Sequence, residues 1–152
     1  VPHDADWTYS LAIPPSHFWY ALCARESYRR IHEWIQSAFQ ILGLATELAP
    51  LPNPTAPGQC FRGHEASDLL WQGRKIAGAA QRRTRSGLLI QGSVQPRDLS
   101  LARADWELAM RAAGAAGQGL AWAEFKPDAQ LLEETRALTA QKYSRADYHQ
   151  KQ

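Results

Sequence analysis

The sequence is short of the residues and patterns that mark several protein classes. Its 152 residues include only two cysteines, Cys23 and Cys60, which lie 37 positions apart and form no Cys-x-x-Cys pair. This scarcity argues against a disulfide framework or a cysteine-based zinc site, and it favours a reducing, cytoplasmic location. No apolar run is long enough to span a membrane and no secretory signal peptide is visible, so we expect no membrane association.

The sequence also has little excess of charge of either sign. Lysine and arginine number 17 against 15 aspartates and glutamates, and the formal net charge of +2 is too small to argue for nucleic-acid binding. The one concentrated basic segment, Arg82, Arg83 and Arg85, favours a solvated hairpin over a phosphate site or an acidic partner. The chain has no internal repeat or low-complexity tract, and its 45% hydrophobic content suits a single domain with a real core.

Hydrophobic periodicity predicts an α+β fold, in which helices pack against a mainly antiparallel or mixed sheet. Strands are expected at 7–13, 68–72, 75–82 and 87–94. The last three of these form an antiparallel meander, because a tight turn at Gln72-Gly73 and a looser turn at 83–87 join them.

Three helices are expected as well. They are a long first helix that ends at Gly43, a second over 100–116, and a third that opens at Pro127-Asp128. The first helix has two alternative starts, a cap at Ser16 or a position nearer Ala24.

The stretch from Gly73 to Gln81 combines a glycine turn, an isolated lysine and a run of tiny residues. Residues 77–80 carry almost no side chain, so a ligand has room to lie directly on this strand. Lys75, at the edge of such a floor, is suited to hold a phosphate or polarise a carbonyl oxygen. The alternatives are a solvated surface lysine and small residues that serve only close packing of a helix on the strand.

The two cysteines differ in their expected surroundings. Cys60 follows the proline-rich loop 49–58 and is expected to be exposed, whereas Cys23 beside the first helix is expected to be a small buried hydrophobe. A nearby lysine would lower the pKa of Cys60 and populate the reactive thiolate. His64 is a weaker candidate for a base, since an extended backbone would keep it away from Cys60.

A polar cluster at the start of the chain has the residue types of a metal site. His3, Asp4 and Asp6 are nevertheless more typical of a polar turn, so we expect no metal site.

The central residues resemble the lipoate–protein ligase and octanoyltransferase family. The motif consists of Cys60-Phe61, then 73–82, then Gly92-Ser93, and its spacing of fifteen residues from Cys60 to Lys75 is similar to the cysteine-dependent octanoyltransferase branch. The segment 26–31 also resembles the first long helix of the family. The resemblance implies a fold shared with biotin–protein ligases.

It also implies transfer of an octanoyl or lipoyl group to a lysine of a lipoyl domain or the glycine cleavage H protein. In the octanoyltransferase branch, the residue matching Cys60 takes the acyl group from acyl carrier protein, and the residue matching Lys75 lowers the pKa of that cysteine; no cofactor is needed. In the ligase branch, the same lysine contacts an acyl-adenylate made from free lipoate and ATP with magnesium. Substrate contacts are expected at Val1, His3, Gly78, Ala79, Ala80, Gln91, Gly92 and Ser93.

Two features depart from the family pattern. Ile90-Gln91 stands where the family has glutamine-histidine before Gly-Ser, so any hydrogen bond made by that histidine is altered. The chain also begins just after the position expected for the family's arginine and glycine pair. We therefore expect an N-terminally incomplete catalytic domain over 1–152, and the alternative outside the enzymes is a non-catalytic fragment that binds a lipoyl domain or a partner subunit.

Overall fold

The computed structural model describes residues 5–53, 63–96 and 99–145. The chain divides into two compact units, Val1–Ala121 and Trp122–Gln152. The first unit contains β1 (Trp7–Ile13), α1 (Phe18–Ala21), α2 (Ala24–Ile41), β2 (Glu47–Leu48), β3 (Leu69–Trp71), β4 (Arg74–Thr84), β5 (Gly87–Val94) and α3 (Arg103–Gln118). The second contains α4 (Ala129–Leu138) and a π-helical turn, Thr139–Tyr143. The predicted α+β class is confirmed, and one catalytic domain over the whole chain stays a prediction.

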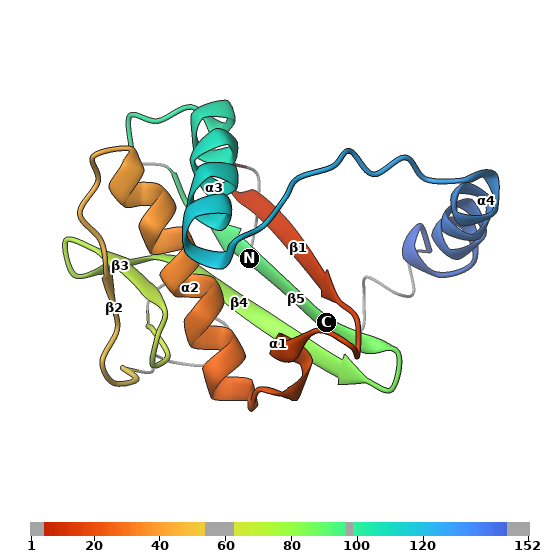
Figure 1. Cartoon of the computed structure of the whole chain (residues 1–152), viewed down its shortest axis with the longest axis horizontal. Coiled ribbons are helices and arrows are strands. Elements are labelled where there is room, and N and C mark those ends of the chain that lie inside the picture. Colours follow the sequence, from red (N-terminus) through yellow and green to blue (C-terminus); the bar gives the residue numbers. More distant parts are fainter. Residues whose placement is uncertain (1–4, 54–62, 97–98, 146–152) are drawn as a thin grey trace. The chain divides into compact units, whose positions relative to one another are not determined.

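The five strands form one sheet in the order β1-β5-β4-β3-β2, with every neighbouring pair antiparallel (Figure 1). The predicted meander of β3, β4 and β5 is therefore confirmed. Gln72 and Gly73 between β3 and β4 both have positive φ angles, 51° and 72°. Positive φ at both central residues is the geometry that closes a two-residue hairpin with the twist of the strands.

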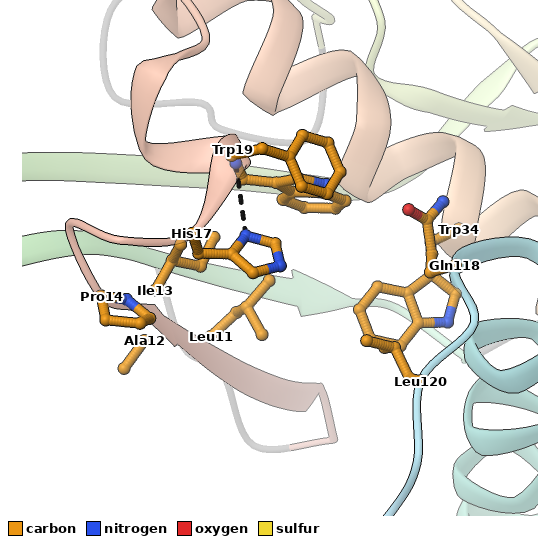
Figure 2. Close-up of a pocket in the computed structure, with 10 residues that line it drawn as sticks. Leu11, Ala12, Ile13, Pro14, His17, Trp19, Trp34, Gln118 and Leu120 are labelled. Atoms are coloured by element: carbon orange, nitrogen blue, oxygen red, sulfur yellow. Dashed lines mark hydrogen bonds between the residues drawn. The ribbon is translucent and has the colours of Figure 1, made fainter.

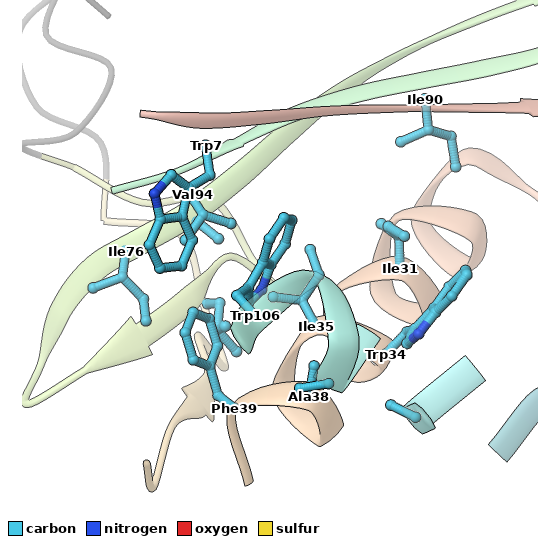
Figure 3. Packing of buried hydrophobic residues seen from close by; sticks show 14 of the residues in the cluster. Trp7, Ile31, Trp34, Ile35, Ala38, Phe39, Ile76, Ile90, Val94 and Trp106 are labelled. Atoms are coloured by element: carbon cyan, nitrogen blue, oxygen red, sulfur yellow. The ribbon is translucent and has the colours of Figure 1, made fainter. Parts of the chain in front are cut away.

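Helices α2 and α3 pack on one face of this sheet (Figure 1). Ile31, Ile35 and Phe39 from α2 and Trp106 from α3 meet the strand residue Val94 in a single buried cluster (Figure 3). These α2 residues recur at spacings of four, which places them on one side of the helix. These residues form the apolar stripe of α2, which is thus the core face of the helix.

The ends of α2 settle two predictions and correct a third. The helix starts at Ala24, and the other predicted cap, Ser16, precedes the separate helix α1. At the other end Gly43 adopts a φ of 76°, which confirms it as the stop. The prediction for Cys23 was wrong: Cys23 is the extended N-cap residue of α2, outside the apolar stripe, and its side chain is exposed.

The opposite face of the sheet, which we call the open face, carries several described residues that are exposed to solvent. Side chains alternate along a strand, so the residues next to the core residues point away from the helices. On β1, β4 and β5 these include Thr8, Ser10, Ala80 and Gln91, which are exposed, and Gly78 and Ser93, which are half-buried. Short or flexible side chains therefore form the part of this surface around Gly78 and Ser93.

The two C-terminal helices were predicted with different success. The helix predicted over 100–116 is α3, which runs on to Gln118 and is ended by Gly119 with a φ of 64°. Asp128 caps α4 as expected, since its carboxylate accepts a hydrogen bond from the backbone N–H of Leu131 at 2.8 Å. Within the described ranges, no helix is long and apolar enough to cross a bilayer.

Candidate functional site

Lys75 lies at the start of β4, where the strand contains a bulge. Leu69 pairs with Ala77 and Leu70 pairs with Lys75, so Ile76 is an extra residue with no partner on β3. The bulge turns both Ile76 and Ala77 into the core, where each is buried. Lys75 is thereby freed from the core, and its side chain runs along the strand over Gly78.

Gly78 is the reason this path is available. A Cβ atom at this position would lie 2.6 Å from Lys75 Cε and 2.8 Å from Lys75 Nζ. These distances are shorter than a van der Waals contact, so any residue with a side chain would displace the lysine. The glycine in the predicted small-residue floor thus accommodates Lys75 itself.

The ammonium of Lys75 is paired with a carboxylate that has no exposure to solvent. Lys75 Nζ lies 2.7 Å from Asp68 Oδ2, and the two side chains are 13% and 0% exposed. Asp68 Oδ2 also accepts a hydrogen bond from the backbone N–H of Glu65 at 2.7 Å, and Asp68 Oδ1 accepts one from the hydroxyl of Tyr28. Three donors therefore compensate the burial of this carboxylate.

Tyr28 connects α2 to the same cluster. Its hydroxyl donates to Asp68 and accepts the backbone N–H of Ala79 at 3.3 Å. Pairing between β3 and β4 stops at Ala77, so this hydroxyl serves Ala79 where the neighbouring strand no longer does. The ring of Tyr28 contacts His32 edge-on, with 4.4 Å between the ring centroids.

Burial shifts the pKa values of three side chains around Asp68 in the direction that favours their uncharged forms. Desolvation lowers the pKa of His32 to about 4; the charge of Asp68 opposes this shift and that of Lys75 adds to it. Desolvation also raises the pKa of Tyr28 far above its ordinary value, with a further contribution from its hydrogen bond to Asp68. The pKa of Tyr9 is raised in the same way, first by burial and then by the charge of Asp68. The ion pair of Lys75 and Asp68 therefore carries the charge of the cluster.

The predicted substrate-contacting residues of β4 and β5 form three adjacent cross-strand pairs. They are Gly78 with Ser93, Ala79 with Gly92, and Ala80 with Gln91. The first and third pairs lie on the open face beside Lys75, as the floor requires.

The middle pair faces the helices instead. A Cβ atom on Gly92 would lie 2.3 Å from Cζ of Tyr9, whose ring covers the glycine from the core side. Ala79 packs against the edge of the same core. Substrate contact by these two residues stays a prediction, and only their backbone atoms border the open face.

Two polar side chains of the floor form hydrogen bonds to β1 or to the residue just before it. Ser93 donates to Asp6 Oδ2 at 2.7 Å, and Gln91 donates to the hydroxyl oxygen of Ser10 at 3.3 Å. Gln91, at the position that departs from the family pattern, thus contacts its direct cross-strand partner on β1.

The remaining predicted residues have separate outcomes. Val1, His3 and Cys60 lie outside the described residues, so a contact of Cys60 with Lys75 stays a prediction. His64 pairs with Asn53 in an isolated β-bridge. Of the basic segment, Arg83 donates to the carbonyl oxygen of Leu22 at 2.9 Å and thereby fastens the turn between α1 and α2.

The sequence reasoning missed Asp68, Tyr28 and His32. Asp68 is the first residue of the strand predicted over 68–72, and Tyr28 lies within the predicted long first helix. The available signals were a carboxylate just before a buried strand and a hydroxyl on an otherwise apolar helix face. Neither signal identifies a partner, because Tyr28 and Asp68 are 40 residues apart.

A separate apolar pocket of about 130 Å³ lies between β1, α1 and the end of α3 (Figure 2). Leu11, Trp34 and Leu120 line it, and His17 borders it while accepting a hydrogen bond from the backbone N–H of Trp19 at 3.3 Å. Its lining contains none of the residues around Lys75, so it is not part of the candidate site.

Comparison with known proteins identifies a family and a shared fold. Residues 1–100 match the family model of the lipoyl protein ligase A/B catalytic domain. The octanoyltransferase LipM of Oceanobacillus iheyensis is 35% identical over 95 residues, which cover 62% of this chain and 35% of that protein. The LipM of Bacillus subtilis is 34% identical over 103 residues, covering 62% and 37%. The chain thus spans about a third of the length of the curated relatives it matches.

Solved structures share the fold. A Thermoplasma acidophilum protein assigned as a lipoate protein ligase, with lipoic acid bound, superposes with a TM-score of 0.77 at 15% identity. A lipoate-protein ligase A bound with ATP gives a TM-score of 0.76 at the same 15% identity. Each superposition covers 95% of this chain and 64% of the other.

Proposed function

Because this chain belongs to the family of lipoyl protein ligase A/B catalytic domains, we propose that it takes part in moving an octanoyl or lipoyl group onto a lysine of a lipoyl carrier domain. Cys60 is the proposed nucleophile, Lys75 its electrostatic partner, and acyl carrier protein the proposed donor. The relatives that are named octanoyltransferases favour the octanoyl group.

In the proposed first step, the thiolate of Cys60 attacks the carbonyl carbon of the acyl thioester on the donor. The bond between that carbon and the donor sulfur breaks, and the donor leaves as a thiolate that takes up a proton. In the second step, the amine of the carrier lysine attacks the Cys60 thioester, loses a proton and forms an amide, while the Cys60 thiolate leaves. Negative charge develops on the carbonyl oxygen in both steps, so a fixed cation beside that oxygen lowers both barriers.

The observation that carries this proposal is the placement of Lys75. Its ammonium is held at the open face by Asp68, and its 13% exposure leaves the group partly shielded from water. A cation is most effective for an oxyanion where water is largely excluded and the geometry is already fixed. Gly78 accommodates the lysine, and the small, exposed Ala80 beyond it leaves room for an unbranched aliphatic chain.

The proposal is tested by incubating the chain with octanoyl–acyl carrier protein and measuring its intact mass. We expect an octanoyl adduct that hydroxylamine removes, that maps to Cys60 and that Cys60→Ala abolishes. Lys75→Ala is expected to slow adduct formation by about 100-fold, the range seen for losing one oxyanion donor. Cys23→Ala is the matched control and is expected to leave the adduct intact. Absence of the adduct, or its survival in Cys60→Ala, contradicts the thioester mechanism.

The ligase reaction predicts a different set of results. Chain, lipoate and ATP with magnesium would then yield lipoyl-adenylate, lost in Lys75→Ala but kept in Cys60→Ala. The described surroundings of Lys75 do not fit a magnesium ion, because the carboxylate of Asp68 is already paired with the ammonium and accepts two further hydrogen bonds. Elsewhere in the described ranges, no group of three or more His, Cys, Asp or Glu is placed to hold a metal. Binding of a lipoyl domain without either reaction would instead favour the non-catalytic fragment.

A further inference from the structure

We infer that Asp68 and Tyr28 are positioning residues. Together they fix the ammonium of Lys75 at the open face, beside the carbonyl oxygen of the acyl group that is transferred. The inference rests on the proposed function, because it assigns the parts that hold the lysine of that same site. It is carried by the contacts of three residues, which come from α2, from β4 and from the loop just before β3.

A lysine side chain needs such a holder because it has four rotatable bonds and a strongly hydrated head group. On an open sheet face it would extend into water. Lys75 instead folds back over Gly78 to reach Asp68 Oδ2 at 2.7 Å. The carboxylate thus selects one conformation among many, and that conformation places the ammonium beside the small-residue floor.

Asp68 is itself held rigidly through its backbone. Its N–H donates to the carbonyl oxygen of Glu65 at 3.1 Å, and its carbonyl oxygen accepts the N–H of Ala49 at 2.8 Å. The neighbouring Ser67 donates its N–H to the carbonyl oxygen of Ala49, also at 2.8 Å. With the N–H of Glu65 bound to Oδ2, the carboxylate cannot rotate without breaking several hydrogen bonds.

Tyr28 completes the arrangement from the helix side. Its hydroxyl has one hydrogen to donate, and that hydrogen goes to Asp68 Oδ1. Its oxygen accepts the N–H of Ala79, so the same atom is aligned by β4. Helix α2 and strand β4 therefore jointly set the position of the carboxylate that holds Lys75.

A direct test measures how well Lys75 is held. The full chain is treated briefly with limiting acetic anhydride at fixed pH, and acetylation of Lys75 is measured relative to the exposed Lys126 by peptide mass spectrometry. In the unmodified chain we expect Lys75 to react at least about 10-fold more slowly than Lys126, the factor for about 1.4 kcal/mol of protection.

Two variants remove the proposed holders. Asp68→Asn removes the charge and is expected to raise the Lys75-to-Lys126 ratio by about 10-fold, as for loss of a charged hydrogen bond. Tyr28→Phe removes one neutral donor to the carboxylate and is expected to raise the ratio by about threefold. Tyr20→Phe, which removes a hydroxyl that donates to the carbonyl oxygen of Thr84, is the matched control and is expected to leave the ratio unchanged.

A role in the reaction has its own signature. Both variants are expected to lower the maximal rate of Cys60 acylation while leaving the half-saturating concentration of octanoyl–acyl carrier protein unchanged, since the lysine acts on the reacting carbonyl. A change in the half-saturating concentration alone would overturn the positioning role. Circular dichroism and thermal unfolding identify any variant that has lost its fold.

The outcomes remain separable from those of the proposed function. If the unmodified chain forms no Cys60 adduct, the proposed function fails, and the acetylation ratio still decides whether Asp68 and Tyr28 hold Lys75. If Asp68→Asn does not fold, the ratio in Tyr28→Phe decides instead. An unchanged ratio in a folded Asp68→Asn, or in Tyr28→Phe where that variant decides, overturns the inference.

Discussion

Gly78 illustrates how a missing side chain shapes the candidate site. The atoms that a Cβ at this position would meet most closely, Cε and Nζ of Lys75, are the far end of a flexible side chain. The same Cβ would lie 3.1 Å from Asp68 Oδ1, which is fixed by its own hydrogen bonds. An added methyl group is therefore expected to displace the lysine and leave the sheet in place.

Replacing Gly78 by alanine tests this directly. We expect Gly78→Ala to increase acetylation of Lys75 by about 10-fold, as when a charged hydrogen bond is lost. The free energy of unfolding is expected to fall by about 1–3 kcal/mol, because the buried carboxylate loses one partner. Gly117→Ala is the control: nothing lies within 4 Å of its added Cβ inside α3, and a gain of about 0.5–1 kcal/mol is expected. Urea unfolding supplies the energies, and unchanged protection of Lys75 would contradict the steric account.

At the scale of elements, β1, β5 and α3 pack closely through the ring of Tyr9. Tyr9 of β1 is the direct antiparallel partner of Gly92 of β5, and its ring occupies the space a side chain would need. The other side of the Tyr9 ring contacts Trp106 of α3, with 6.4 Å between the centroids of the two rings. Trp7 also packs on Trp106, at 5.5 Å, so an aromatic layer joins the sheet to the helix (Figure 3).

This packing predicts a measurable coupling between two strands. Gly92→Ala is expected to destabilise the chain by about 1–3 kcal/mol, since the methyl group would overlap a ring that the core holds in place. Tyr9→Leu removes the ring and relieves the overlap, so the double variant should be more stable than the sum of the single effects implies. We expect a coupling energy of about 1–2 kcal/mol from the four urea unfolding curves. Simple additivity would show that the ring moves aside.

The elements that could be predicted are those with local signals. The meander follows from branched and small residues separated by Gln72-Gly73, and α2 follows from its four-residue spacing with Gly43 as the stop. The two-residue strand β2 was missed because a pair of residues carries no periodicity. The bulge at Ile76 was missed too, and so was the resulting orientation of the Lys75 side chain away from the core.

The candidate site divides in the same way. Lys75 and Gly78 were identifiable because a lone lysine beside tiny residues is a local pattern. Their anchors were not, since Tyr28 reaches Ala79 across 51 positions and Asp68 across 40. Such contacts depend on how α2 lies across β4, which no short stretch of sequence specifies.

At the scale of the whole molecule, burial is concentrated in the first unit. None of the described residues from 122 to 145 is buried, and Leu131, Leu132 and Leu138 of α4 are each at least 40% exposed. The first unit also contains the one fully buried histidine among the described residues, His32, which is 0% exposed. Neither ring nitrogen of His32 makes a hydrogen bond of normal geometry, and the backbone of Tyr28 interacts with the ring only weakly.

This histidine makes the stability of the molecule depend on pH. Burial lowers the pKa of His32 to about 4 in the folded chain, against about 6.5 in an unfolded one. Between these values the unfolded state binds a proton that the folded state does not, so the free energy of unfolding rises with pH. Lowering the pH from 7 to 4 should therefore remove about 3 kcal/mol through His32 alone, with little further loss below 4.

His32→Leu isolates this contribution, because leucine cannot titrate and all other groups are shared with the unmodified chain. Urea unfolding of both proteins at several pH values between 4 and 7 gives the difference. We expect the acid-induced loss of stability to be smaller in His32→Leu by about 2–3 kcal/mol, with the difference developing below pH 6.5. Asp68 and Lys75 are the charged groups that influence the pKa of His32. Both are retained in the two proteins, so their own contributions to the pH dependence of stability cancel to first order. Equal acid sensitivity in the two proteins would mean that His32 is protonated while the chain is folded.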